Sequence, residues 1–214
     1  YLEQSYKFIN NDKINLIVAE TLKQYLYVFE ENKISNMKKN FGKFSLINEA
    51  FQKCYLDDKN TENYFNIIVN NENDSNYSRY VFFHLNYLIK ENKYDEAKKI
   101  TDSLSYLDSS LLISQSKKWI IDQEFKKFQK IFSCKNSNDI VSEFLFLVAN
   151  LHSSQNDYER SNFYLNISHY LNPKFIFNLS LLANNHYLKK DYVKAKEILK
   201  NFNEKDEFYY WFKI

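Results

Sequence analysis

Histidines are the side chains of this sequence best suited to metal binding or proton transfer. The four are His84, His152, His169 and His186, and an imidazole can bind a metal or exchange a proton near neutral pH. A zinc site on a helix needs a carboxylate or a second histidine three or four residues away. Neither His152 nor His186 has such a neighbour. We therefore expect these two histidines to have packing roles, and we expect no metal and no cofactor.

Nucleophilic and acid–base catalysis find little support in the other side chains. The chain has one glycine, Gly42, so it cannot contain the Gly-x-Ser-x-Gly turn that activates a serine. The acidic pairs Asp57-Asp58 and Glu30-Glu31 lie near expected helix ends, where surface charge is the simpler interpretation. We predict that this chain is not an enzyme.

The two cysteines, Cys54 and Cys134, lie far apart in the sequence and have no neighbours at metal-ligand spacing. Free, reduced and mostly buried thiols are the favoured interpretation, and a disulfide is the alternative. The sequence does not assign the cellular compartment, although a cytoplasmic location is favoured. A periplasmic location is retained, because the sequence begins at Tyr1 and a signal peptide could have been removed. We interpret the chain as a fragment of a longer protein.

The composition favours an all-helical fold. Of the 214 residues, 44% are hydrophobic and 18% aromatic, whereas one is glycine and one is proline. Hairpins, phosphate loops and dinucleotide folds need several glycines. The 29 basic and 27 acidic residues leave a net charge of +2, and the arginines are Arg79 and Arg160 alone, which argues against nucleic acid as a partner. No apolar run reaches the roughly 20 residues that a membrane span needs.

An internal repeat organises the second half of the sequence. Residues 142–165 match residues 176–199 without a gap. Hydrophobic residues at three- and four-residue steps predict two helices in each unit, joined by a turn whose acid caps the second helix. The matched pairs include Ala149 with Ala183, His152 with His186, Asp157 with Asp191, Tyr158 with Tyr192, and Ser161 with Ala195.

Small residues mark where the paired helices should cross most closely, because a larger side chain would push the helix axes apart. Ala149 and Ala183 serve this role in the first helices. The corresponding landmark of the second helix recurs at a nearly constant interval, at Ala97, Phe128, Ser161 and Ala195. Pro173 is expected to end one unit and to lie in the first turn of the next.

This pattern resembles the tetratricopeptide repeat family, which pairs antiparallel helices in units of about 34 residues with small residues at the helix crossing. Two units match at about 142–175 and 176–209, and two degenerate units precede them, with Phe128 and Leu85 in place of small residues. The resemblance implies an all-α fold, an α-α superhelix or solenoid of helix pairs. A further first helix is expected at residues 206–212.

The N-terminal part is less regular. We expect residues 1–77 to form degenerate helical repeats of the same solenoid, ahead of tetratricopeptide-like repeats at 78–214, but their register is not assigned. The expected features are a helix tail at 1–9, a long helix at 14–29, a hinge at Gly42 within the connection 32–43, a hairpin of 45–56 with 63–69, and a polar loop at 70–76.

The resemblance also implies a binding surface, because the first helices of such arrays line a concave face. Three asparagines share one register, so their amides could hold the backbone of an extended peptide while three aromatic residues receive its side chains. The asparagines are Asn86, Asn150 and Asn184, and the aromatic residues are Phe82, Phe146 and Tyr187. The full candidate set is Arg79, Phe82, Asn86, Lys90, Lys117, Phe146, Asn150, Ser153, Ser180, Asn184 and Tyr187.

The function predicted from these residues is a non-enzymatic scaffold that binds another protein or a peptide. Two alternatives stay open. One is a helical-repeat RNA-binding protein of the pentatricopeptide kind, against which the scarce arginine and balanced charge count. The other is a scaffold segment of a larger enzyme or envelope-assembly protein.

Overall fold

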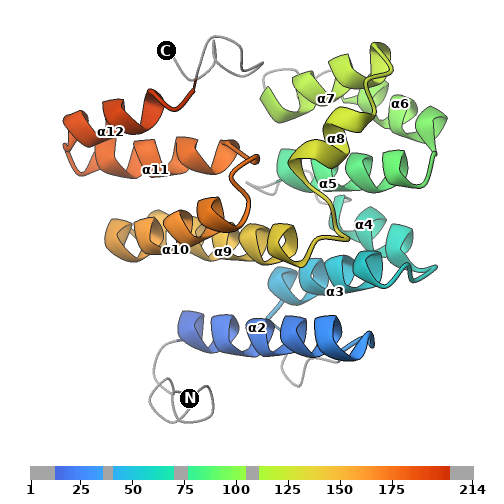
Figure 1. Cartoon of the computed structure of the whole chain (residues 1–214), viewed down its shortest axis with the longest axis horizontal. Helices are drawn as coiled ribbons and strands as arrows, with labels where there is room; N and C mark the ends of the chain where they lie inside the picture. The colour runs from blue at the N-terminus through green and yellow to red at the C-terminus, as the bar shows by residue number, and fades with distance from the viewer. Residues whose placement is uncertain (1–12, 36–40, 70–76, 105–110, 203–214) are drawn as a thin grey trace.

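The computed structural model describes residues 13–35, 41–69, 77–104 and 111–202, and within these ranges the chain is helical without a strand (Figure 1). The all-α fold class is confirmed, with helices that pack in adjacent pairs. The features expected at residues 1–9, 70–76 and 206–212 lie outside the described residues. The helices are α2 (Lys13–Glu31), α3 (Lys43–Tyr55), α4 (Thr61–Val69), α5 (Tyr77–Lys90), α6 (Tyr94–Ser103), α7 (Leu111–Ile121), α8 (Lys126–Ile131), α9 (Ser137–Ser154), α10 (Tyr158–Leu171), α11 (Phe177–Leu188) and α12 (Tyr192–Leu199).

One type of backbone turn joins the two helices of each pair from α3 to α12. Just after each first helix, one residue adopts a left-handed conformation with φ between 54° and 62°. The next N–H then donates to the carbonyl oxygen five residues earlier, at 2.7 to 3.0 Å, which closes the helix end. The left-handed residues are Asp57, Asn92, Gln123, Asn156 and Lys190. Their nearly regular spacing places the α3–α4 hairpin in the register that the sequence left unassigned.

The residues expected at close helix crossings are buried. Ala97, Ala149, Ser161, Ala183 and Ala195 are each 6% exposed or less. In the α7–α8 pair the equivalent position holds Phe128, which is also fully buried. Its ring centroid lies 5.3 Å from that of Trp119 and 5.9 Å from that of Phe82. An aromatic ring at this crossing accompanies a second helix of six residues, the shortest described.

Gly42 and Pro173 both lie at helix boundaries. Gly42 is the N-cap of α3 with a φ of 63°, a conformation that glycine adopts without strain, and its carbonyl accepts from the Leu46 N–H. Its role as a hinge stays a prediction. Pro173 follows Asn172, the C-cap of α10, but α11 begins only at Phe177. Pro173 therefore lies in the connection, and its predicted place in the first turn of the next helix is wrong.

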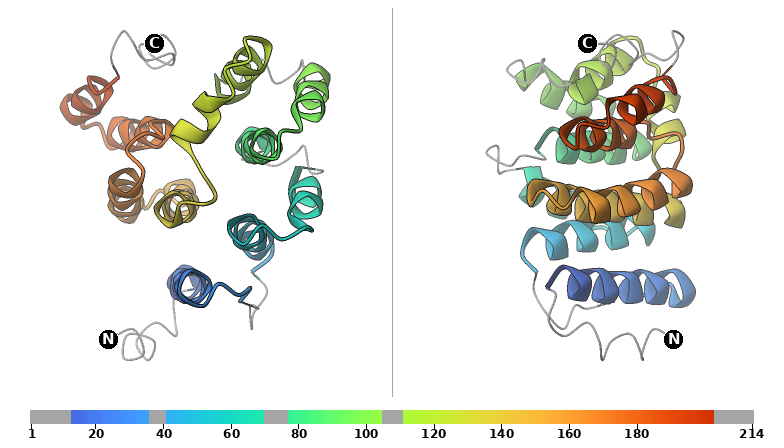
Figure 2. Two further views of the ribbon diagram at one scale, coloured as in Figure 1. Left: turned by 45° about the vertical axis from the view of Figure 1, so that its right-hand side comes forward. Right: turned by 90° about the vertical axis from the view of Figure 1, so that its left-hand side faces the viewer.

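The superhelix returns on itself. After α8 the chain crosses back, and α9 packs against α2 and α3 as well as α10 (Figures 1 and 2). The ring of Tyr25 in α2 meets that of Phe144 in α9 edge-on, with centroids 6.1 Å apart. α9 is thus enclosed by α2, α3, α10 and α11, and α5 by α4, α6, α7 and α8: every residue of 79–89 and of 142–149 is buried. The first helices of these two pairs form an interior.

Aromatic rings fill that interior. Phe83 of α5 is the hub, with ring centroids 5.2 Å from Phe51 of α3, 4.5 Å from Phe132 after α8, and 6.0 Å from Phe175 before α11. Phe82 also meets Phe175 at 5.7 Å. Four parts of the chain that are distant in sequence therefore share one core, which holds the returning helices together.

Candidate functional site

Four of the predicted binding residues are interior residues. Arg79, Phe82, Asn86 and Phe146 are each 8% exposed or less. Phe82 packs against Phe128 and Phe175, Asn86 bonds to the chain at Phe128 and Phe132, and Arg79 and Phe146 cover one another. A side chain buried in this way is not available to a peptide. The prediction that these four residues line a concave binding surface is wrong.

Arg79 instead forms a buried ion pair at the centre of the molecule. Its guanidinium donates to both carboxylate oxygens of Glu143 and, at 2.8 Å, to Oδ1 of Asn178. The guanidinium carbon lies 3.6 Å from the ring centre of Phe146 and 4.6 Å from that of Phe175. Burial raises the pKa of the Glu143 carboxyl, and the charge and hydrogen bonds of Arg79 oppose that rise. The arrangement joins α5, α9 and α11.

A chain of hydrogen bonds continues from this pair. Nδ2 of Asn178 donates to Oγ of Ser168 at 2.7 Å, and that hydroxyl donates to the Ser142 carbonyl at 2.7 Å. The Ser142 hydroxyl donates in return to the Ser168 carbonyl at 2.8 Å. Because these buried groups satisfy one another, the network stabilises the contact between α9, α10 and α11.

Asn86 also has an internal role. Its Nδ2 donates to the carbonyl oxygens of Phe128 and Phe132, both at 3.0 Å, and its Oδ1 accepts from Gln129 at 3.1 Å. The amide thus holds α8 and the chain after it against α5. Asn150 is half-buried and Asn184 is exposed, so the three asparagines of one register lie in three different environments and form no ladder.

Among the other candidates, Lys90 and Ser153 bind neighbouring parts of the fold. Nζ of Lys90 lies 2.7 Å from a carboxylate oxygen of Asp57, and Oγ of Ser153 donates to Oδ1 of Asn185 at 2.7 Å. Lys117 is half-buried. Lys90 thus bonds to the α3–α4 turn, whereas Ser153 bonds to α11.

Ser180, Asn184 and Tyr187 do share an accessible surface. They lie on α11 at intervals of four and three residues, which places them on one side of the helix together with Leu188. Ser180 is half-buried, Asn184 is exposed, and Tyr187 and Leu188 are 60% and 49% exposed. We call these four residues the α11 stripe. The ring of Tyr187 contacts Tyr192 at the start of α12, with centroids 5.4 Å apart, which extends the stripe onto the next helix.

The chemistry available on the α11 stripe is that of recognition. The Oγ of Ser180 donates to the Phe177 carbonyl of its own helix at 2.6 Å, so the free capacity of this hydroxyl is as an acceptor. The side-chain amide of Asn184 is exposed and has no hydrogen-bond partner within the described part of the chain, so it presents both a donor and an acceptor. Tyr187 and Leu188 add apolar area. Polar and apolar groups therefore alternate along the stripe.

The repeated histidines bind the caps of the second helices. Nδ1 of His152 lies 3.4 Å from Oδ2 of Asp157, and Nδ1 of His186 lies 3.2 Å from Oδ2 of Asp191. The Oδ1 of each aspartate accepts a backbone N–H three residues later, at 3.2 Å, so both turn acids are N-caps as predicted. Among the described residues, no group of three histidines, cysteines or acids could hold a metal ion.

Within the residues that the structure describes, His84 differs from His152 and His186 because neither of its ring nitrogens is paired with a carboxylate. It is buried, its ring stacks on Phe65 with centroids 5.9 Å apart, and neither ring nitrogen has a hydrogen-bond partner among the described residues. Burial lowers the pKa of His84 to about 4, while the charge of Glu62 acts to raise it. The neutral imidazole is therefore the form that the fold accepts.

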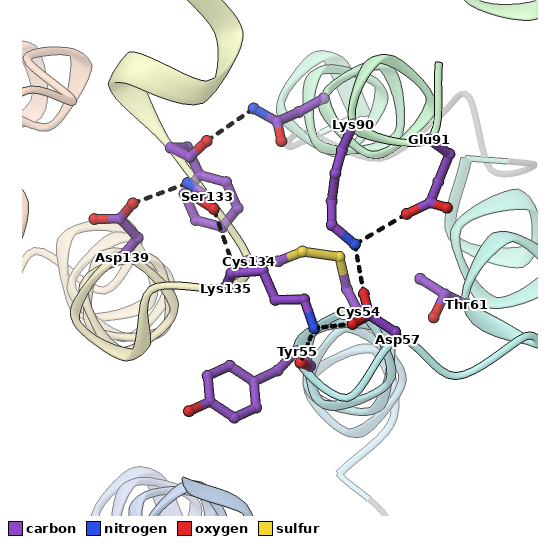
Figure 3. Close-up of a disulfide and its surroundings, with 12 residues drawn as sticks. Cys54, Tyr55, Asp57, Thr61, Lys90, Glu91, Ser133, Cys134, Lys135 and Asp139 are labelled. Carbon is purple, nitrogen blue, oxygen red and sulfur yellow. Dashed lines mark hydrogen bonds and ion pairs between the residues drawn. A yellow bond between two sulfur atoms is a disulfide. The ribbon is translucent and has the colours of Figure 1, made fainter. Parts of the chain in front are cut away.

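Cys54 and Cys134 form a disulfide, so the expectation of free thiols is wrong (Figure 3). Cys54 lies at the end of α3 and Cys134 just before α9, with their Cα atoms 5.8 Å apart. Both side chains are buried, as expected. The return of the chain brings the two cysteines together, and their wide separation in the sequence gives no sign of this contact.

An ionic cluster lies beside the disulfide (Figure 3). The carboxylate of Asp57 accepts from Lys90 on one oxygen and from Lys135 on the other, and Lys90 also binds Glu91 at 2.9 Å. Partial burial acts to raise the pKa of Asp57, but the hydrogen bonds and charges of the two lysines hold it below its usual value. Lys135 also donates to the Tyr55 carbonyl. The cluster thus bridges α3, α5 and the chain before α9, as the disulfide does.

One feature of the sequence, separate from the repeat, indicates that α5 and α9 are enclosed. Residues 79–89 and 142–149 are largely apolar on all sides, and a helix of that kind is normally buried all round. Arg79 and Glu143 are the charged residues within these two runs. Opposite charges in two apolar helices indicate that the two side chains pair inside the protein.

Comparison with protein-family models found no match, and searches of curated proteins and of solved structures found none either. No helix in the described ranges is long and apolar enough to cross a membrane. The resemblance to the tetratricopeptide repeat therefore rests on the repeat register and the turns described above.

Proposed function

We propose that this chain is a non-enzymatic, protein-binding scaffold of the tetratricopeptide type, and that it binds through the α11 stripe. The observation that supports this most is the exposure of Asn184, Tyr187 and Leu188 side by side on the last described first helix. Exposed aromatic residues that are not needed for packing are typical of recognition surfaces.

The stripe suits a peptide segment better than a small molecule. Its groups are spread along about two turns of one helix, so they match a ligand that is itself extended. The Asn184 amide can donate to and accept from a peptide backbone, and Tyr187 can cover an apolar side chain. The helix that carries the stripe, α11, is fixed to α9 and α10 by the buried network of Asn178, Ser168 and Ser142, so the surface is preorganised before a partner binds.

A peptide-display selection against the full chain tests this proposal. We expect selected peptides to bind the wild-type protein and to lose about tenfold or more in affinity for the double variant Asn184→Ala/Tyr187→Ala. The matched control is Tyr170→Ala, which removes an exposed tyrosine of α10 that lies outside the stripe. Both variants should nearly keep the wild-type melting temperature, because the side chains that they remove are exposed.

Two results would contradict the proposal. Selected peptides that bind the double variant as well as the wild type would place recognition elsewhere. A salt-dependent gel shift with single-stranded RNA at micromolar protein, unaffected by the double variant, would favour the RNA-binding alternative.

A further inference from the structure

The turn between α11 and α12 exposes apolar and basic side chains side by side. Leu188, Tyr192 and Val193 are 49%, 56% and 82% exposed. Lys190 and Lys194 are exposed among them, and Lys189 lies 3.2 Å from Glu159 of α10. We call Leu188, Lys189, Lys190, Tyr192, Val193 and Lys194 the α11–α12 tip. It adjoins the α11 stripe through the contact of Tyr187 with Tyr192.

The repeat shows that the fold does not require this composition. In the alignment of the two units, Leu188 corresponds to Ser154, Val193 to Glu159 and Lys190 to Asn156. These polar residues of the α9–α10 hairpin are exposed in the same type of turn, with the side chain of Glu159 at 86% exposure. The same backbone therefore carries a serine, a glutamate and an asparagine in one hairpin, and a leucine, a valine and a lysine in the next.

Lys190 adds an observation from the backbone. It adopts a φ of 62°, as Asn156 does at the equivalent position. Asparagine tolerates this left-handed conformation better than lysine does, so local structure alone favours asparagine. The lysine is present against that preference.

The α11–α12 tip has a net positive charge. Lys189, Lys190 and Lys194 outnumber the one acid between them, Asp191, which accepts the Lys194 N–H and lies beside the ring of His186. Lys196 and Lys200 follow along α12 with Glu197, and all three are exposed. An occupant of this surface must therefore supply both negative charge and apolar side chains.

We propose that the α11–α12 tip, together with the α11 stripe, binds an acidic protein segment that carries large apolar side chains. This rests on the proposed function and gives the partner its chemistry. Carboxylates of the segment pair with Lys190 and Lys194, and its apolar side chains cover Leu188 and Val193. A protein segment fits better than an anionic bilayer, because the adjoining Asn184 amide matches a peptide backbone and has no counterpart in hydrocarbon.

Fluorescence anisotropy on the full chain, with defined synthetic peptides, tests this. The probe is a fluorescein-labelled peptide that repeats Asp-Phe-Glu-Leu, and its companion has Asn and Gln in place of Asp and Glu. We expect the acidic peptide to bind about tenfold more tightly than the neutral one at low salt, and we expect salt to reduce that difference.

Variants that carry residues of the α9–α10 hairpin at the equivalent positions of the α11–α12 tip test the site. Leu188→Ser/Val193→Glu places residues that the same turn already accommodates, and should weaken binding of the acidic peptide about tenfold or more. Lys190→Asn/Lys194→Gln should weaken binding and flatten its salt dependence. The matched controls are Ile121→Ser for exposed apolar area and Lys98→Gln/Lys99→Gln for charge, and both should bind like the wild type.

Four outcomes would overturn the inference: equal binding of the neutral peptide, full binding by Leu188→Ser/Val193→Glu, weakening by the controls to the same extent, or tighter binding of phosphatidylserine vesicles than of the acidic peptide. The display selection separates this failure from failure of the proposed function. Neutral peptides that depend on Asn184 and Tyr187 would leave the proposed function standing and exclude the acidic partner. A selection that yields no specific peptide would remove both.

Discussion

Arg79 and Glu143 show how charged residues are used inside this protein. A charge transferred to the interior costs free energy unless it is paired and its hydrogen bonds are made, and both conditions hold here. Because either charge alone would be unpaired, α5 and α9 cannot slide relative to one another without loss of the pair. Arg79 is thus better explained by the positioning of helices than by ligand binding.

Because His84 is buried in its neutral form, we expect the free energy of unfolding to fall in mild acid. Its pKa is about 4 in the folded protein and about 6.5 when unfolded, so between these values the unfolded chain binds more protons. The stability due to neutral His84 is therefore complete above pH 6.5 and falls as the pH is lowered toward 4. The loss is about 3 kcal/mol by the linkage relation. Urea denaturation at several pH values between 4 and 7 measures it.

The matched variant for this effect is His84→Phe, which keeps a ring against Phe65 and removes the titration. Burial also lowers the pKa of His169, so part of the pH dependence remains in the variant. A variant whose free energy of unfolding falls with acid as steeply as that of the wild type would show that His84 is not the responsible group.

At the scale of helices, the small residue at each crossing sets how closely two helices approach. Ala195 is 6% exposed and occupies the position of Ala97 and Ser161 in other hairpins. We expect Ala195→Leu to overpack the α11–α12 contact and to lower the free energy of unfolding by about 1 to 3 kcal/mol. Asn184→Ala on the exposed side of α11 should leave it nearly unchanged. Urea denaturation of the two variants compares them, and an equal loss would mean that the faces of α11 are assigned wrongly.

Local signals explain why the helices and turns of residues 77–199 were predictable. Three of the four turns have an asparagine in the left-handed position or an aspartate that caps the next helix, and both are visible in sequence at Asn156-Asp157; the α7–α8 turn, with Gln123, has neither. The α3–α4 turn uses Asp57 in the same way. Ala50 of α3 occupies the position of Ala149 and Ala183, but the equivalent of Ser161 and Ala195 in α4 is Glu62, so the second-helix landmark does not reveal this register.

The candidate site was predictable only where no later helix covers it. Asn184 and Tyr187 lie on a helix whose outer side stays accessible, and the one-sided model of a solenoid assigned them correctly to the surface. The same model failed for Phe82 and Phe146, because burial there depends on contacts between segments far apart in sequence. The spacing of the repeats does not indicate that α9 contacts α2 and α3.

At the scale of the whole molecule, the return of α9 to α2 and α3 is the feature that separates this fold from an open array. Two kinds of contact secure it near one point, the ionic cluster around Asp57 and the disulfide of Cys54 with Cys134 (Figure 3). Disulfides persist in oxidising compartments, so we expect the chain to fold in one, in contrast to the cytoplasmic location that the sequence favours.

The disulfide gives the prediction for the molecule as a whole. Its two cysteines are separated by 80 positions in the sequence, and the chain-entropy relation for a loop of that length gives about 4 to 5 kcal/mol of stabilisation. We expect Cys54→Ser/Cys134→Ser to lose most of that free energy of unfolding in urea, and the reduced wild-type protein to match the variant. Lys98→Gln/Lys99→Gln, which replaces two exposed lysines of α6, serves as the control and should unfold like the oxidised wild type. If reduction left the urea midpoint of the wild type unchanged, the aromatic core and the ionic cluster would by themselves hold α9 against α3, and the disulfide would contribute little to closing the superhelix.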